Sequence, residues 1–129
     1  MKIIGNGVDI VDNRRIAKSI KIKGFVDRIF TKNEIKDSLK TNNKVSFFAK
    51  RFAAKEAFVK ALGSGFRNNI NYADIEIKNN VKGKPLVKIS SSINNYLKKK
   101  LKINKCKIYI SLSDEYKHSI AFIIINKIK

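Results

Sequence analysis

The 129-residue chain has a single cysteine, Cys106, which excludes an intramolecular disulfide and a cysteine-rich metal site. It also lacks any run of the roughly 20 apolar residues that a membrane-spanning helix requires. Near the N-terminus, Gly5, Asn6 and Asp9 interrupt the apolar stretch that a signal peptide would need. These shortages predict a soluble cytoplasmic protein rather than a secreted or membrane-bound one.

Acidic side chains are also scarce: 10 Asp and Glu stand against 29 Lys and Arg, and the formal net charge is +19. Such a positive charge favours acidic partners, and it raises the alternative of a nucleic-acid-binding module. However, 24 of the basic residues are lysines and only 5 are arginines, whereas base recognition and bidentate phosphate contacts favour arginine. The lysines are spread over the whole chain, so composition alone identifies no nucleic-acid surface.

What remains is the length and composition of one globular domain, with 43% apolar residues and no linker, repeat or low-complexity segment. We therefore expect a single domain over residues 1–129. The apolar patterns predict an α+β fold with a mostly antiparallel sheet packed with helices. The expected helices cover residues 12–23, a short segment from residue 31, 45–62 and 91–102. The expected strands cover residues 3–11, 73–78, 85–90, 106–113 and 118–126.

Local signals mark where several of these helices begin and end. Thr31 and Glu34 have the spacing of a capping box, which predicts a helix that starts at Thr31. Gly24 is expected to end the helix of residues 12–23, and Gly63 the helix of residues 45–62. The first of these helices has a strongly basic outer face, which would attract an acidic partner. That face carries Arg14, Arg15, Lys18 and Lys21.

Two acidic residues are unusual because each has apolar neighbours on both sides: Asp9 in the first strand and Glu56 in the helix of residues 45–62. Mg²⁺ is typically held by one or two carboxylates, several waters and the phosphates of a substrate. Two carboxylates beside Arg51, Lys55 and Lys60 fit a metal-bound diphosphate. The alternative for Glu56 is a surface ion pair with Lys60, four residues further along the helix.

The same helix runs into the segment Gly63, Ser64 and Gly65. A glycine directly after a helix is normally a C-cap, which accounts for Gly63. The second glycine is not needed for that purpose, and the N–H groups of a glycine-rich segment can approach a ligand closely. We therefore include these three residues among the candidate ligand contacts.

Two segments together carry a recognisable signature: GNGVDIV (residues 5–11) and RFAAKEAFVKALGSG (residues 51–65). They closely resemble the holo-[acyl-carrier-protein] synthases, the small class of 4′-phosphopantetheinyl transferases. That family has a G-x-D element near its start, here residues 7–9, and a K-E-x-x-x-K element in mid-chain, here residues 55–60. Each motif alone is weak, but the two together in a chain of this length are specific.

Further matches at GKP (residues 83–85) and ISLSDE (residues 110–115) extend the resemblance over nearly the whole chain. It implies the 4′-phosphopantetheinyl transferase fold. It also implies transfer of the phosphopantetheine arm of coenzyme A to a serine of apo acyl carrier protein, with release of adenosine 3′,5′-bisphosphate. The implied cofactor is Mg²⁺, held by Asp9 and Glu56, and these acids and Lys60 are the implied catalytic residues. The candidates for coenzyme A contacts are Arg51, Lys55, Gly63, Ser64, Gly65 and Pro85.

Similar proteins are trimers with active sites between subunits, so the resemblance implies a homotrimer. It also implies that apo acyl carrier protein docks on the basic helix of residues 12–23, and neither a membrane nor a nucleic-acid partner is expected. One further alternative is a relative that has lost activity and serves only as a binding subunit, although the intact set of Asp9, Glu56 and Lys60 argues against it. The sequence leaves open which group takes the proton of the serine.

Overall fold

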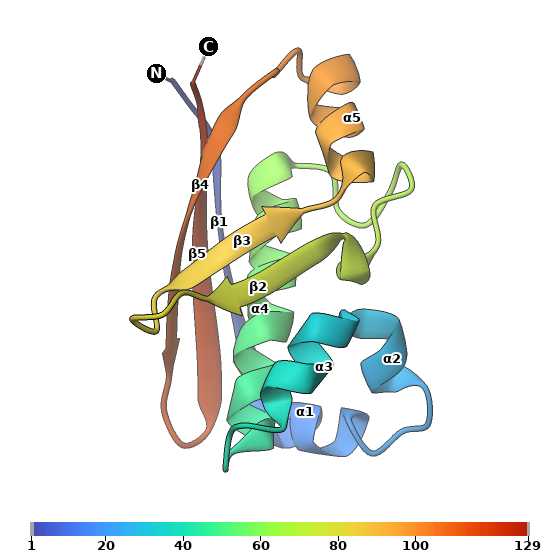
Figure 1. Cartoon of the computed structure of the whole chain (residues 1–129), viewed down its shortest axis with the longest axis vertical. Helices are drawn as coiled ribbons and strands as arrows, with labels where there is room; N and C mark the ends of the chain where they lie inside the picture. The colour runs from blue at the N-terminus through green and yellow to red at the C-terminus, as the bar shows by residue number, and fades with distance from the viewer. Residues whose placement is uncertain (1, 129) are drawn as a thin grey trace.

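The computed structural model describes residues 2–128, whose strands form two antiparallel sheets arranged around one long helix, α4 (Lys44–Leu62) (Figure 1). The larger sheet has the strand order β1-β5-β4, and α4 covers one of its faces. The smaller sheet is a hairpin of two strands that crosses in front of α4 in Figure 1. The expected α+β fold is thus confirmed, with two sheets in place of one. The strands are β1 (Lys2–Asp12), β2 (Ile75–Asn79), β3 (Pro85–Ile89), β4 (Cys106–Asp114) and β5 (His118–Lys127).

Short helices gather near the two ends of α4 (Figure 1). Near its N-terminal end lie α1 (Asn13–Ser19), α2 (Phe25–Ile29) and α3 (Lys32–Ser38). Near its C-terminal end lies α5 (Ser91–Lys100), and a 3-10 turn at Tyr72–Asp74 leads into β2. No helix within residues 2–128 combines the length and the apolar character needed to cross a membrane.

The helix predicted over residues 12–23 is shorter in the structure, where it is α1, and a further helix, α2, begins after residue 24. α1 ends at Ser19, and Gly24 has a left-handed φ of +87°, with which it precedes α2 instead of ending α1. α2 gives no signal in the sequence, because its 5 residues are too few to show a helical repeat. Other boundaries are confirmed: Thr31 and Glu34 form the expected capping box, and Gly63 caps α4.

Glycines allow β1 to pack directly on α4. A Cβ atom at Gly5 would overlap the carbonyl oxygen of Ala61, and a Cβ atom at Gly7 would overlap that of Ala57. Two strand residues rise about 6.6 Å and four helical residues about 6.0 Å, so the strand and the helix stay in step along this contact. Asp9 is the next residue on this face of β1, and the strand therefore brings it to the surface of α4.

The core fills the space between α4 and the sheets. Four large apolar side chains of α4 are buried in it: Phe48, Phe52, Val59 and Leu62. On the larger sheet, Ala121, Ile123 and Ile125 of β5 are fully buried. Since these three alternate along the strand, the residues between them point to the opposite face of the sheet.

That opposite face is apolar yet remains open to solvent in the described part of the chain. The strand register sets Val8 opposite Phe122 and Ile10 opposite Ile120. These four residues are 38% to 59% exposed, and Tyr109 of β4, which is 42% exposed, extends the patch. We call these five residues the outer sheet face. An exposed apolar surface of this kind marks a site of association.

Candidate active site

Asp9 and Lys60 form an ion pair between β1 and α4. Lys60 Nζ lies 3.0 Å from Asp9 Oδ1, and it also donates to the carbonyl oxygen of Val8 at 3.0 Å. The side chain of Asp9 is 15% exposed, whereas that of Lys60 is 56% exposed. The ammonium group is therefore held over the carboxylate at the border with solvent.

Glu56 lies one helical turn before Lys60 but binds a different group. Its Oε1 accepts a hydrogen bond from the phenol of Tyr72 at 3.1 Å. Lys60 pairs with Asp9 instead, so the surface ion pair between Glu56 and Lys60 that the sequence allowed does not form. Glu56 is half-buried.

Tyr72 shows that the two acids share one electrostatic neighbourhood. Burial of the ring, the charge of Glu56 and the hydrogen bond to that carboxylate together raise the pKa of Tyr72 to about 12. Arg15 opposes this rise, and Asp9 adds to it. Asp9, Glu56 and Arg15 therefore all act on a single phenol, which stays protonated and remains a donor near neutral pH.

The donor set at this place suits a hard cation that brings ligands of its own. Asp9 and Glu56 supply two carboxylates from two different elements, and within residues 2–128 no three His, Cys, Asp or Glu side chains gather around one point. Mg²⁺ commonly takes one or two carboxylates and completes its shell with water and phosphate oxygens. The pair therefore fits Mg²⁺ with a phosphate ligand and does not fit zinc, which takes about three or four protein ligands.

Arg51 lies on a different side of α4, about 140° around the helix axis from Glu56. Its guanidinium is buried, stacks over the Phe47 ring at 3.6 Å, and donates to the Phe47 carbonyl oxygen at 3.5 Å. Burial lowers the pKa of Arg51, and the carboxylates of Glu34 and Asp37 oppose this effect. The Nε atom is buried and has no hydrogen-bond partner in the described chain.

Arg51 and Pro85 border one hollow with a volume of about 440 Å³. It opens between α4, the turn that joins β2 to β3, and β4. Two of the residues expected to contact coenzyme A therefore lie together. Lys50 lines the same hollow and supplies a further cation that the sequence pattern did not single out.

Lys55 was expected to contact coenzyme A, but its side chain is fully buried. Its ammonium group donates to Glu34 Oε1 at 2.8 Å, to the carbonyl oxygen of Tyr72 at 3.0 Å, and to that of Ile75. Burial lowers the pKa of Lys55, and the Glu34 carboxylate opposes this effect. The expected contact is thus corrected: Lys55 joins α3, α4 and β2, and it presents no donor to a ligand.

The segment after α4 reverses the chain. The N–H group of Gly63 already donates to two carbonyl groups of α4, at 3.0 and 3.1 Å, so it is engaged in ending the helix. Gly65 has a φ of +61°, which other residues rarely adopt, and the Ser64 hydroxyl donates to its carbonyl oxygen at 2.8 Å. Beyond this turn, Phe66 stacks on Tyr72 with ring centroids 3.8 Å apart. The second glycine therefore allows a packing contact beside Glu56.

The arginines of α1 have partners within the chain. Asp12 is the N-cap of α1, and its carboxylate lies 2.8 Å from the guanidinium of Arg14. Arg15 lies over the Phe52 ring, 5.9 Å from its centre, on the side of α4 that carries Glu56. Arg15 is therefore close to the candidate site, whereas Arg14 is tied to the end of its own helix.

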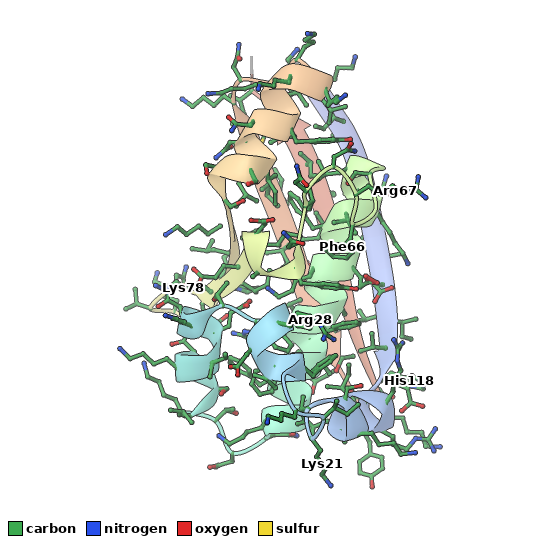
Figure 2. The ribbon with its side chains drawn as sticks, turned by 90° about the vertical axis from the view of Figure 1, so that its right-hand side faces the viewer. Lys21, Arg28, Phe66, Arg67, Lys78 and His118 are labelled. Carbon is green, nitrogen blue, oxygen red and sulfur yellow. The ribbon has the colours of Figure 1, made fainter. Side chains whose placement is uncertain are left out.

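Lys18 of α1 and Lys21, which follows that helix, continue a basic surface on this side of the molecule. Lys18 and Lys21 are both exposed. Figure 2 shows Lys21 below α2, Arg28 on α2, and Arg67 further up in the loop after α4. Phe66 lies in the same loop as Arg67 (Figure 2). The basic surface thus runs from α1 past α2 to the loop beside the acids.

Tyr72 is the contact residue that sequence analysis missed. It touches Glu56 across a separation of 16 residues, so no local spacing could have indicated the contact. Its position between a loop and a strand is typical of an aromatic residue that packs in the core. Only the tertiary structure reveals the contact between Tyr72 and Glu56.

Comparison with known proteins places this chain in a family. A family model for the 4′-phosphopantetheinyl transferase superfamily matches residues 5–121. A holo-[acyl-carrier-protein] synthase of Pelagibacter ubique (strain HTCC1062) is 49% identical over 127 residues, which cover 98% of this chain and 99% of the relative. The matched region includes both segments that form the candidate site.

Solved structures show the same fold. The holo-[acyl-carrier-protein] synthase of Neisseria meningitidis superposes with a TM-score of 0.86 at 35% identity, covering 97% of this chain and 99% of that one. A holo-(acyl-carrier-protein) synthase of Bacillus anthracis str. Ames, solved in complex with CoA (3′,5′-ADP), superposes with a TM-score of 0.82 at 29% identity. The superposition covers 98% of this chain and 99% of the Bacillus protein.

Proposed function

The chain belongs to the 4′-phosphopantetheinyl transferase superfamily, and we propose that Asp9, Glu56 and Lys60 are the residues with which it transfers the 4′-phosphopantetheine group. The donor is coenzyme A, the acceptor is a serine of apo acyl carrier protein, and adenosine 3′,5′-bisphosphate is released. The observation that supports the residue assignment is the packing of β1 on α4, where Asp9 pairs with Lys60 and where Asp9 and Glu56 both raise the pKa of Tyr72.

Asp9 and Glu56 would hold Mg²⁺ together with the diphosphate of coenzyme A. When bound, the ion supplies a Lewis acid that neutralises the diphosphate oxygens. Both carboxylates belong to regular elements, so their positions are fixed before the substrate arrives, which lowers the entropic cost of orientation. Mn²⁺ has the same preference for oxygen ligands and would serve as a substitute.

Lys60 is the residue that can act on developing charge. In the described structure its ammonium group neutralises Asp9, which would otherwise lie unpaired against α4. A metal cation bound to Asp9 would take over this neutralisation and free the Lys60 ammonium group. The flexible side chain of Lys60 could then turn toward the leaving phosphate. A charge contact that strengthens in the transition state contributes to the rate rather than to substrate binding.

The nucleophile is the serine of the partner. Its Oγ forms a bond to the β-phosphorus of coenzyme A while the bond to the bridging oxygen of adenosine 3′,5′-bisphosphate breaks, and the serine proton must leave. We assign that proton to the carboxylate of Glu56, directly or through water. His118 is the only histidine in the sequence, but it lies exposed beside the β4–β5 turn, 2.9 Å from Glu115.

Coenzyme A contacts would come from the hollow lined by Lys50, Arg51 and Pro85. This hollow and the acid pair lie on different sides of α4, since Arg51 is about 140° around the helix from Glu56. The site would be complete if the hollow of one copy of the chain lay beside Asp9 and Glu56 of a second copy. The outer sheet face supports such an assembly, and we propose a homotrimer with active sites between subunits.

Apo acyl carrier protein would dock on the basic surface that includes α1. Lys18 and Lys21 are exposed there, and Arg15 connects that surface to the neighbourhood of Glu56. An acidic carrier domain would be attracted by this surface and would bring its serine toward the acids. Contacts of this kind act mainly on the rate of encounter and weaken as salt is added.

The function is tested by incubating the purified protein with apo acyl carrier protein, coenzyme A and Mg²⁺, followed by intact-mass spectrometry of the carrier. The expected result is a mass gain of one phosphopantetheine group, which is lost when a chelator removes the metal. An unmodified carrier with the wild-type protein would contradict the function and favour a binding subunit. Gain of mass despite complete chelation would contradict the metal.

A further inference from the structure

Tyr72 is fixed to α4 at three points. Its ring stacks on Phe52 with centroids 5.6 Å apart and an interplanar angle of 16°. Its carbonyl oxygen accepts from Lys55 Nζ at 3.0 Å, and its phenol donates to Glu56 Oε1 at 3.1 Å. Residues 52, 55 and 56 are neighbours on the helix surface, because positions three and four apart share one face. Backbone, ring and hydroxyl of Tyr72 are therefore all held by a single turn of α4.

Two further contacts keep the phenol in this place. Phe66, in the loop after α4 (Figure 2), stacks on the Tyr72 ring with centroids 3.8 Å apart. Lys55, which holds the carbonyl group of Tyr72, is itself locked by Glu34 at 2.8 Å. The ring thus has little freedom to turn, and its hydroxyl has one strong acceptor, the Glu56 carboxylate.

The contact occupies one carboxylate oxygen of Glu56 and leaves the other available. Oε1 accepts the bond from Tyr72, whereas Oε2 accepts no hydrogen bond from any residue between 2 and 128. A glutamate on a helix can otherwise sample several rotamers, and immobilising such a side chain costs free energy when a ligand binds. A donor that already fixes the carboxylate removes that cost from the binding step.

We propose that Tyr72 is a positioning residue of the transferase: its hydroxyl fixes Glu56 through Oε1 and so presents Oε2 to the divalent cation and the reacting groups. This inference rests on the proposed function of Glu56. It also gives the buried Lys55 of the motif a role. Lys55 anchors the backbone of Tyr72, and Tyr72 in turn orients Glu56, the residue next to Lys55 in α4. The loop of Gly63–Gly65 contributes by returning Phe66 to the ring.

The substitution Tyr72→Phe tests the proposal, since it keeps the aromatic stack and removes only the hydroxyl. Mn²⁺ binding in the presence of coenzyme A is measured by electron paramagnetic resonance, and transfer is measured on apo acyl carrier protein. Loss of an outer partner of a metal ligand typically weakens metal binding or activity by about 10-fold to 100-fold. We expect the Mn²⁺ dissociation constant to rise about 10-fold and kcat to fall about 10-fold, with an unchanged KM for the carrier.

The matched control is Tyr96→Phe, which removes a hydroxyl from a half-buried tyrosine on α5, and it should leave all three quantities unchanged. A Tyr72→Phe variant that melts at a lower temperature but binds Mn²⁺ as tightly as the wild type would overturn the proposal, because packing alone would explain the tyrosine. If the wild-type protein binds Mn²⁺ but modifies no carrier, the proposed function fails while the Mn²⁺ comparison still decides the role of Tyr72. A wild-type protein that binds no Mn²⁺ would overturn both.

Discussion

Lys60 has two conceivable roles, and its position separates them. It pairs with Asp9 at 3.0 Å while more than half of its side chain is exposed, at 56%. An ion pair of this exposure contributes less than about 1 kcal/mol to stability. A lysine whose only role were that pair would therefore be nearly dispensable. A lysine that meets the leaving phosphate would be needed for the rate.

We predict that Lys60→Ala lowers kcat more than it raises KM for coenzyme A, because the contact grows as charge develops on the phosphate. Steady-state kinetics and a thermal melt of the same variant measure both effects. Lys98→Ala, on α5, is the control for loss of one exposed lysine. A near-normal kcat in Lys60→Ala would reduce the residue to the partner of Asp9.

Among individual residues, the sequence predicts those site residues that lie in a motif or stand out among apolar neighbours. Asp9, Glu56 and Lys60 belong to two motifs whose strand and helix could be recognised, and in the structure Asp9 pairs with Lys60 while both acids raise the pKa of Tyr72. Lys55 could not be interpreted, because a lysine beside a candidate acid is expected to be exposed. Its burial depends on Glu34, which lies 21 residues away. The role of Tyr72 could not be predicted either, because its contact with Glu56 is also distant in the sequence.

Among the elements, the junction of α3, α4 and β2 depends on one buried ion pair. Glu34 accepts from Lys55 at 2.8 Å and also from the N–H groups of Thr31 and Ile77, each at 2.9 Å. Both side chains of the pair are 0% exposed. A buried pair contributes little net stability over an apolar pair, but removal of one partner leaves an uncompensated charge.

We predict that Glu34→Gln lowers the free energy of unfolding by about 3 to 5 kcal/mol, because the Lys55 ammonium would lose its counter-charge. The double variant Glu34→Gln with Lys55→Met should recover a large part of that loss. Urea unfolding of the two variants and the wild type measures the difference. If Glu34→Gln is as stable as the wild type, the ion pair between Glu34 and Lys55 does not hold α3, α4 and β2 together.

The elements that the sequence predicted well have strong local signals. Thr31 and Glu34 start α3 through their capping box, and a left-handed glycine at residue 63 ends α4. Gly24 carried an ambiguous signal, because a glycine with positive φ can precede a helix as well as follow one. The separation into two sheets also escaped prediction, since turn patterns identify hairpins but not which hairpins pair with each other.

The basic face of α1 is an element with a prediction of its own. Lys18 is a cleaner probe than Arg15, because Arg15 lies against Phe52 and acts on Tyr72. We predict that Lys18→Glu raises KM for apo acyl carrier protein and leaves KM for coenzyme A nearly unchanged, since it reverses a charge that steers the acidic partner. Lys98→Glu, with the same change of net charge on α5, is the control. An equal loss for both substrates would contradict docking on α1.

For the whole molecule, the outer sheet face is the feature that a single chain leaves unexplained. Phe122 lies near the middle of this face and pairs across the strands with Val8 and Ser111. We predict that Phe122→Lys converts the proposed homotrimer to monomers and abolishes transfer, because a buried charge at a subunit contact is costly. Light scattering coupled to size-exclusion chromatography measures the mass. Leu86→Lys, at an exposed position on β3, is the control, and an unchanged mass for Phe122→Lys would contradict association through this face.

The proposed transfer depends above all on the carboxylate of Glu56, and its most direct test is intact-mass spectrometry of apo acyl carrier protein incubated with Glu56→Gln. The substitution keeps the shape of the side chain and its capacity to accept from Tyr72, but it removes the charge. We predict a carrier of unchanged mass, from a variant that melts within a few degrees of the wild type. A full gain of one phosphopantetheine group at the wild-type rate, with saturating Mg²⁺, would contradict the site.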